Sequence, residues 1–142
     1  MKKKLNCILL IEDNELTNIF NQKLIKNQNI TDHICVAESA EEALDFLGNG
    51  KLPANETKHP EPDIIFLDIN MPGMNGWEFL AEFEKLNKKH IKVPKIVMLT
   101  TSPNPDDEQR AKSINKIIAF KRKPLTKIIL LEILKEHFPD YL

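Results

Sequence analysis

Short apolar runs alternate with segments of helical periodicity along the whole sequence, and this alternation leaves few possible folds. Residues 7–11 and 64–67 contain no charged or strongly polar side chain, as expected of strands buried on both faces of a parallel sheet. Further strands are expected over residues 31–37, 95–99 and 117–120. Five strands alternating with helices predict an α/β fold, in which a doubly wound parallel sheet carries helices on both faces.

Five helices are predicted between and after these strands. The first spans residues 15–28 and is capped by Asn14, and the second runs from the capping pair Ser39 and Glu42 to Leu47. The others are expected over residues 76–87, 105–113 and 125–138. In the first helix, the apolar residues at helical spacing are Leu16, Ile19, Phe20, Leu24 and Ile25. In the third helix, the residues expected to point inward are Trp77, Leu80, Phe83 and either Leu86 or Ala81. The apolar face of the last helix is expected to consist of Ile128, Ile129, Leu131, Ile133 and Leu134.

The composition favours a soluble globular protein over a nucleic-acid-binding or membrane protein. Hydrophobic residues make up 42% and charged residues 29% of the sequence, and the formal net charge is -1. A balanced charge argues against a nucleic-acid-binding surface, and no run approaches the ~18 apolar residues of a membrane helix. The apolar run at residues 7–11 is too short for a signal peptide. We therefore expect a cytoplasmic protein with one domain, residues 1–142, and no second domain that acts as an output.

Two further features carry no assigned chemistry. Cys7 and Cys35 lie in strand-like runs without the spacing of a metal site, and they are expected to fill the core in a reducing compartment. Residues 51–61 have no periodicity and contain Pro53 and Pro60. They predict a polar surface loop that is longer than the usual connection of ~2 to 6 residues. We assign no function to this loop.

Side chains suited to phosphoryl chemistry follow the first, third, fourth and fifth predicted strands. Glu12 and Asp13 follow the first strand, Asp68 the third, Thr100 the fourth and Lys123 the fifth. Because the carboxyl ends of parallel strands meet at one edge of a sheet, we expect these side chains to lie together. Three carboxylates repel one another unless a cation lies among them, and oxygen ligands suit Mg²⁺. The edge is therefore predicted to bind Mg²⁺ and to receive a phosphoryl group, with Asp68 as the nucleophile.

Each of these residues also has a purely structural interpretation. An Asp after a strand can cap or turn a loop, and an acidic pair can begin a helix. Thr100 can serve as a cap, and Lys123 can be an exposed cation before a proline. The joint placement after the first, third, fourth and fifth strands favours the chemical interpretation.

The residues that follow the strands resemble those of a known family, the receiver domains of two-component response regulators, and in particular the stand-alone CheY-like kind. The phosphoacceptor motif of that family is an apolar strand that ends in Asp and is followed by Met-Pro, Gly, Met and Gly; residues 67–76, LDINMPGMNG, match it. The acidic pair of the family matches Glu12 and Asp13, its hydroxyl residue matches Thr100, and its Lys-Pro dipeptide matches residues 123–124. The resemblance covers nearly the whole chain and implies the strand order 2-1-3-4-5.

The resemblance also implies roles, a cofactor and partners. The Lys-Pro peptide is commonly cis in the family. The implied phosphodonor is a histidine kinase or a histidine phosphotransfer protein, and the implied output is a downstream protein or a second copy of the chain, bound through the last two helices and the fifth strand. No nucleic-acid or membrane partner is expected. The implied site residues are Asp68, Thr100 and Lys123 for phosphoryl chemistry; Glu12, Asp13, Asp68 and the main-chain carbonyl of Asn70 for Mg²⁺; and Thr100 and Phe120 for the switch.

The sequence departs from the family pattern at several points. Glu12 stands where Asp is usual, which should not abolish metal binding, and Thr101 stands where a smaller residue is usual. The interval from Thr100 to Lys123 is one residue longer than in the chemotaxis protein CheY, which typifies the stand-alone receivers. Thr101 is therefore an alternative for the functional hydroxyl. The loop at residues 51–61 is an insertion relative to compact members of the family.

Other function classes fit the same residues less well. A haloacid-dehalogenase-like phosphatase needs a second Asp two positions after the nucleophile, and this position is Asn70. A flavodoxin-like cofactor binder needs a phosphate-binding first loop, and an acidic loop at residues 12–15 repels phosphate. A degenerate receiver would lack one or more of the acceptor, metal-binding and lysine residues. All of these residues are present in this sequence. The preferred hypothesis is a signalling receiver that catalyses its own phosphorylation and dephosphorylation and has no turnover substrate.

Overall fold

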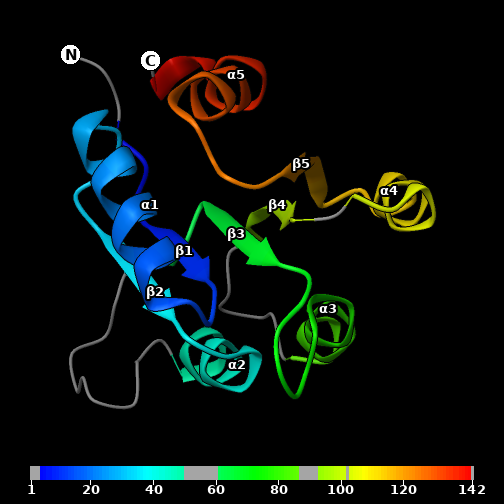
Figure 1. Ribbon diagram of the computed structural model, residues 1–142. Coiled ribbons are helices and arrows are strands. Elements are labelled where there is room, and N and C mark those ends of the chain that lie inside the picture. The colour runs from blue at the N-terminus through cyan, green and yellow to red at the C-terminus, as the bar shows by residue number, and fades with distance from the viewer. Residues whose placement is uncertain (1–3, 50–60, 87–92, 102, 142) are drawn as a thin grey trace.

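The computed structural model describes residues 4–49, 61–86, 93–101 and 103–141 (Figure 1). The loop predicted for residues 51–61 lies outside the described residues except for Glu61. The strands are β1 (Ile8–Ile11), β2 (Ile34–Ala37), β3 (Ile64–Asp68), β4 (Lys95–Thr100) and β5 (Ile117–Arg122). The helices are α1 (Glu15–Asn27), α2 (Ala40–Asn49), α3 (Gly76–Glu84), α4 (Pro105–Lys112) and α5 (Lys127–His137), followed by the 3₁₀ helix η1 (Pro139–Tyr141).

The strands form one parallel sheet in the order β2-β1-β3-β4-β5, which confirms the predicted fold. In the register of this sheet, Ile11 lies opposite Leu67 and Asp68 lies opposite Leu99. The residue after β1 and the last residue of β3 are therefore neighbours at one edge, which is the geometry that the sequence predicted.

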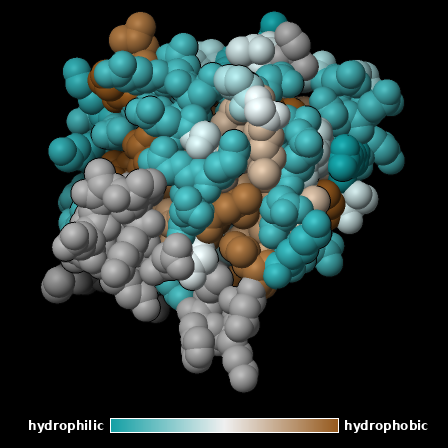
Figure 2. All heavy atoms as spheres, turned by 90° about the horizontal axis from the view of Figure 1, so that it is seen from below, coloured by the Kyte–Doolittle hydropathy of each residue, from teal (hydrophilic) through white to brown (hydrophobic). Residues whose placement is uncertain are grey.

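Helices cover both faces of the sheet, as Figure 1 shows. One core cluster contains Leu9, Ile65 and Met98 from the strands and side chains from α2 and α3. A second core cluster contains the alternate strand residues, such as Leu10 and Phe66, with α1 and α5. Successive strand residues point to opposite faces, so strands that are apolar throughout are needed to fill both clusters. The face on the α2 and α3 side is mainly hydrophilic and carries a narrow hydrophobic strip (Figure 2).

The helix starts follow the capping predictions with two differences. Asn14 accepts a hydrogen bond from the Thr17 N–H, as predicted. Ser39 Oγ accepts from the Glu42 N–H, but the Glu42 carboxylate accepts from the Glu38 N–H, so only half of the predicted capping box is confirmed. The last helix begins at Lys127 and not at residue 125, because Thr126 in an extended conformation caps it.

The apolar pattern identified the buried face of two helices only in part: Ile25 in α1 and Ile133 and Leu134 in α5 are buried as predicted. In α1, Leu16 is 76%, Phe20 55% and Ile19 44% exposed, while Asn18, Asn21 and Ile25 are the buried residues. In α5, Ile128 is exposed, Ile129 and Leu131 are half-buried, and the buried residues are Leu130, Ile133 and Leu134. In α3, Trp77, Leu80 and Phe83 point inward as predicted, Leu86 is half-buried just beyond the helix, Ala81 is exposed, and Phe79 is also buried.

The reason for the failure in α1 is geometric. Residues 18, 21 and 25 lie on one helical stripe, and two members of that stripe are asparagines. A search for apolar residues therefore finds the neighbouring stripe, which faces outward. Cys7 and Cys35, by contrast, are buried and free as predicted, with 3.6 Å between their sulfur atoms. Among the described residues, no helix is long and apolar enough to cross a membrane.

Candidate functional site

Three acidic side chains meet at the carboxyl edge of the sheet. Glu12, Asp13 and Asp68 each place a carboxylate oxygen within 4.8 Å of the others. Glu12 and Asp68 are both only 5% exposed, whereas Asp13 is exposed. The structure therefore brings together all three acids that the sequence singled out. Partial burial and a hydrogen bond with Glu12 raise the pKa of Asp13 above its ordinary value.

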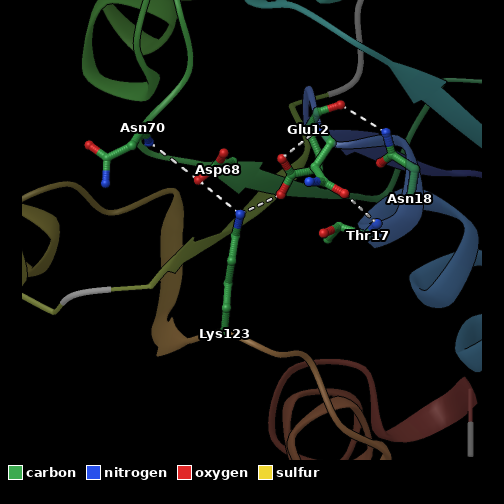
Figure 3. Close-up of polar contacts among 7 residues, drawn as sticks. Glu12, Thr17, Asn18, Asp68, Asn70 and Lys123 are labelled. Carbon is green, nitrogen blue, oxygen red and sulfur yellow. Dashed lines mark hydrogen bonds and ion pairs between the residues drawn. The ribbon is translucent and has the colours of Figure 1, made fainter.

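Lys123 supplies positive charge to this acidic cluster. Its Nζ lies 3.2 Å from Asp68 Oδ1 and donates a hydrogen bond to Glu12 Oε1 (Figure 3). Burial of the ammonium lowers the pKa of Lys123, but the hydrogen bond with Glu12 and the charges of Asp68 and Glu12 outweigh that effect and raise the pKa above its ordinary value. Lys123 is therefore a cation shared by two buried carboxylates, and it offsets only part of their negative charge.

The loop after β1 is held by the start of α1. Glu12 Oε2 accepts a hydrogen bond from the Asn14 N–H over 3.1 Å. The Glu12 main-chain carbonyl accepts from Asn18 Nδ2 over 2.8 Å, as Figure 3 shows. Sequence reasoning missed Asn18, because an asparagine in a helical segment carries no recognisable signal of chemistry.

Asp68 is fixed by contacts on one of its two carboxylate oxygens. Oδ1 faces Lys123 Nζ and accepts from the Asn70 N–H over 3.3 Å. Both of these contacts, with residues that the structure describes, involve Oδ1. Oδ2 thus remains available to a ligand or a reacting atom.

The donor set suits a hard cation such as Mg²⁺. Mg²⁺ prefers oxygen ligands in octahedral geometry and keeps several waters. Three carboxylates within 4.8 Å, one of them exposed, offer such oxygens and leave room for water. A single lysine leaves the cluster of three acids with a negative charge, which a divalent cation neutralises. The residues present therefore fit the ion.

The turn between β3 and α3 packs tightly behind Asp68. Gly76 donates its N–H to the Ile69 carbonyl over 2.8 Å. A Cβ atom at Gly76 would lie 3.0 Å from both the Asp68 carbonyl oxygen and the Ile69 Cα. Gly73 adopts a φ of 74°, in the left-handed region that favours glycine. The glycines of the LDINMPGMNG segment thus shape the main chain that carries Asp68.

The two candidate hydroxyl residues lie in different environments. Thr100 is the last residue of β4 and is 2% exposed, and its carbonyl accepts from the Lys123 N–H over 2.7 Å. Thr101 is exposed and lines a groove beside Lys123. The Lys123–Pro124 peptide is cis, as the resemblance implied. Phe120 is half-buried in β5 and lines a second groove, of about 230 Å³, against α4.

The groove beside Lys123 is the larger of the two and was not predicted. Its volume is about 610 Å³, and its lining includes Leu16, Phe20, Thr101, Lys123 and Pro124. It lies between α1 and the segment that follows β5. The exposed Leu16 and Phe20 of α1 therefore border the site and do not belong to the core.

Helix α4 is attached to α3 through Trp77. The Trp77 indole N–H donates to Asp107 Oδ1 over 3.1 Å, and the Arg110 guanidinium lies 4.4 Å from the centre of the Trp77 ring. Ala111 is the buried residue of α4. The contacts of α4 with Trp77 are thus polar and aromatic, and Ala111 joins the helix to the core.

Comparison with known proteins gives one consistent match. Residues 8–135 match the model of the response regulator receiver domain. The response regulator Rcp1 of Synechocystis sp. is 34% identical over 100 residues, which cover 70% of this chain and 65% of Rcp1. The hybrid signal transduction histidine kinase B of Dictyostelium discoideum is 33% identical over 146 residues, which cover 95% of this chain and 7% of the kinase. The chain thus spans less than two thirds of the length of these two relatives.

The solved structures agree with the sequence matches. The crystal structure of a two-component response regulator from Cytophaga hutchinsonii has a TM-score of 0.81 and 28% identity, and the alignment covers 94% of this chain and 97% of that one.

Proposed function

The chain belongs to the response regulator receiver domain family, and we propose that Asp68 is the residue that accepts the phosphoryl group. The observation that carries this proposal is the pairing of Asp68 Oδ1 with Lys123 Nζ at 3.2 Å inside the acidic cluster of Glu12, Asp13 and Asp68. A buried carboxylate with one uncommitted oxygen, a fixed ammonium and a cation site beside it is suited to nucleophilic attack on phosphorus.

In the proposed reaction, Asp68 Oδ2 attacks the phosphorus of a phosphohistidine. The new O–P bond forms while the P–N bond breaks, and the histidine nitrogen leaves with the bonding electron pair. Hydrolysis reverses the modification: water attacks the phosphorus, the O–P bond to Asp68 breaks, and a proton passes to solvent. The chain thereby catalyses its own phosphorylation and dephosphorylation without a turnover substrate.

The Lys123 ammonium is proposed to stabilise the charge of the transferred group. Its Nζ already contacts Asp68 Oδ1, so it is placed to pair with phosphoryl oxygens on the same carboxylate. Glu12, Asp13, Asp68 and the Asn70 carbonyl are the proposed Mg²⁺ ligands, and the ion supplies charge neutralisation and orientation of the phosphoryl oxygens when bound.

We assign the switch hydroxyl to Thr100 and the switch aromatic to Phe120. Thr100 is buried at the end of β4, and its carbonyl is hydrogen-bonded to the Lys123 N–H. The exposed position of Thr101 favours a role in the wall of the groove, where its methyl group narrows access to Lys123.

The proposed phosphodonor is a histidine kinase or a histidine phosphotransfer protein. The groove of about 610 Å³ beside Lys123 supports this partner, because the exposed Leu16 and Phe20 provide an apolar contact surface next to the acceptor. The similarity to a hybrid signal transduction histidine kinase is in line with it. A cytoplasmic location, and the absence of a nucleic-acid or membrane partner, stay predictions.

The proposed output surface comprises α4, β5 and α5. The groove of about 230 Å³ between α4 and β5 includes Phe120, so a change in the Phe120 rotamer alters the shape of that surface. A downstream protein or a second copy of the chain is the proposed binder.

Labelling with acetyl phosphate in the presence of Mg²⁺ tests the proposal. Wild type should gain one hydrolytically labile acyl phosphate per chain, detected by intact mass and mapped to Asp68. Asp68→Asn should remove the label, whereas Asp45→Asn, on the exposed surface of α2, should not. Stoichiometric label on Asp68→Asn would show that another residue is the acceptor.

A further inference from the structure

Asn18 is a buried polar residue that the phosphoryl chemistry described above does not use. It is 3% exposed and lies on the inward stripe of α1. Its Nδ2 donates to the Glu12 carbonyl over 2.8 Å. Its Oδ1 is buried and has no hydrogen-bond partner among the residues that the structure describes.

The orientation of the Asn18 amide follows from its surroundings. The Glu12 carbonyl oxygen can only accept, so it must face the NH₂ group of the amide. Exchange of Nδ2 and Oδ1 would place two oxygen atoms against each other. The unpartnered atom of Asn18 is therefore the oxygen.

The asparagine at this position has opposing effects on stability. Its hydrogen bond satisfies the Glu12 carbonyl, whereas its own buried Oδ1 has no partner among the described residues and costs stability. A leucine of similar volume would remove the unpartnered oxygen but would leave the Glu12 carbonyl without its donor. The specific contribution of the asparagine is therefore the hydrogen bond that holds the Glu12 carbonyl in place.

The hydrogen bond from Asn18 holds the main chain of the acidic pair, Glu12 and Asp13. The Glu12 N–H donates to the Ala37 carbonyl over 3.1 Å, and the Glu12 carboxylate is held by Lys123 and the Asn14 N–H. The carbonyl is the remaining polar group of Glu12, and it belongs to the peptide group that leads directly into Asp13. Asn18 holds this carbonyl (Figure 3).

We propose that Asn18 is a positioning residue for the metal site: through the Glu12 carbonyl it fixes the Glu12–Asp13 main chain, and with it the direction of both carboxylates. This inference rests on the proposed function, since it assumes that the acidic pair binds Mg²⁺. Residues that orient metal ligands typically change metal affinity by about 10-fold or more when they are lost.

The test compares Mg²⁺ affinity with stability. Asn18→Leu should raise the Mg²⁺ dissociation constant about 10-fold in isothermal titration calorimetry, and its thermal midpoint without Mg²⁺ should fall, because the Glu12 carbonyl loses its donor. Asn21→Leu is the matched control, because Asn21 is equally buried on the same helix and the described residues show no hydrogen bond between it and Glu12 or Asp13. Its Mg²⁺ dissociation constant should stay within about twofold of wild type.

Equal Mg²⁺ affinities for Asn18→Leu and Asn21→Leu would overturn the proposal. If leucine does not fit at position 18, Asn18→Ala and Asn21→Ala give the same comparison with smaller side chains. Failure of this inference is distinct from failure of the proposed function. A wild type that is labelled at Asp68 together with an Asn18 variant of unchanged Mg²⁺ affinity refutes only the role of Asn18.

Discussion

Replacement of Gly76 by alanine tests whether the turn behind Asp68 is as tightly packed as the structure indicates. The added Cβ would lie 3.0 Å from the Asp68 carbonyl oxygen and 3.0 Å from the Ile69 Cα. Both neighbours are main-chain atoms, so the contact cannot be relieved by rotation of a side chain. The turn or the start of α3 must move.

Two opposing effects decide the sign of this substitution. A glycine replaced by alanine in a helix gains up to about 1 kcal/mol from propensity and reduced chain entropy. Overpacking against fixed neighbours costs about 1 to 3 kcal/mol. Because both neighbours are main-chain atoms, we expect the upper part of that cost, about 2 to 3 kcal/mol. The net loss of stability should then be about 1 to 2 kcal/mol, or about 3 to 7 °C in thermal midpoint for a chain of 142 residues.

Differential scanning calorimetry of Gly76→Ala, with Gly48→Ala as the control, measures this effect. Gly48 lies in α2, and the nearest atom to a Cβ there is Leu86 Cδ2 at 4.0 Å, an ordinary contact. Gly48→Ala should therefore be neutral or stabilising by up to about 1 kcal/mol. Because Asp68 and Ile69 must shift in Gly76→Ala, Mg²⁺ affinity should also fall. A Gly76→Ala protein as stable as wild type would refute the packing argument.

Further substitutions test the charges and contacts around the site. Asp13→Ala should lower Mg²⁺ affinity at least 10-fold in calorimetry, because the ion loses an accessible carboxylate; an unchanged affinity would remove Asp13 from the ligand set. Lys123→Met should destabilise the Mg²⁺-free protein by up to about 3 kcal/mol, since it leaves buried carboxylates without a counter-ion. The pKa of Lys123 is raised in the folded state, so the stabilisation by its charge is complete below pH ~10.5 and should vanish as the pH rises through the folded pKa. If the difference in unfolding free energy between wild type and Lys123→Met stayed constant up to about pH 12, the ion pair would be contradicted. Trp77→Phe should increase amide exchange in α4 several-fold, because Asp107 loses its donor, and unchanged exchange would show that this contact does not hold the helix.

The sheet and the acidic edge could be predicted because they depend on short-range patterns. An apolar strand that ends at a carboxylate is visible in the sequence, and parallel topology then brings Asp68 beside Glu12. Lys123 also followed from topology, since it comes directly after β5. For these residues, the direction of the strands is enough to give the location.

The inward face of α1 and the anchor of α4 could not be predicted in the same way. The position of Asn18 depends on a stripe that contains two asparagines, and hydropathy gives such a stripe no weight. The bond between Trp77 and Asp107 joins residues 30 positions apart on different helices, and nothing local in the sequence pairs them. Contacts of this kind depend on how the helices pack, which periodicity does not describe.

The way in which α4 is attached should make it easier to move than α5 when Asp68 is phosphorylated. The contacts of Trp77 with Asp107 and Arg110 contribute about 1 to 2.5 kcal/mol together, from one hydrogen bond and one cation–π contact. The buried Leu130, Ile133 and Leu134 of α5 contribute about 1.5 to 3 kcal/mol each. A new phosphoryl group adds about 1.5 to 2 negative charges beside Lys123, whose main chain is bonded to Thr100 at the end of β4. Ala111 is the buried residue of α4, against three in α5, so α4 should move more easily and the proposed output surface should change first at the groove between α4 and β5.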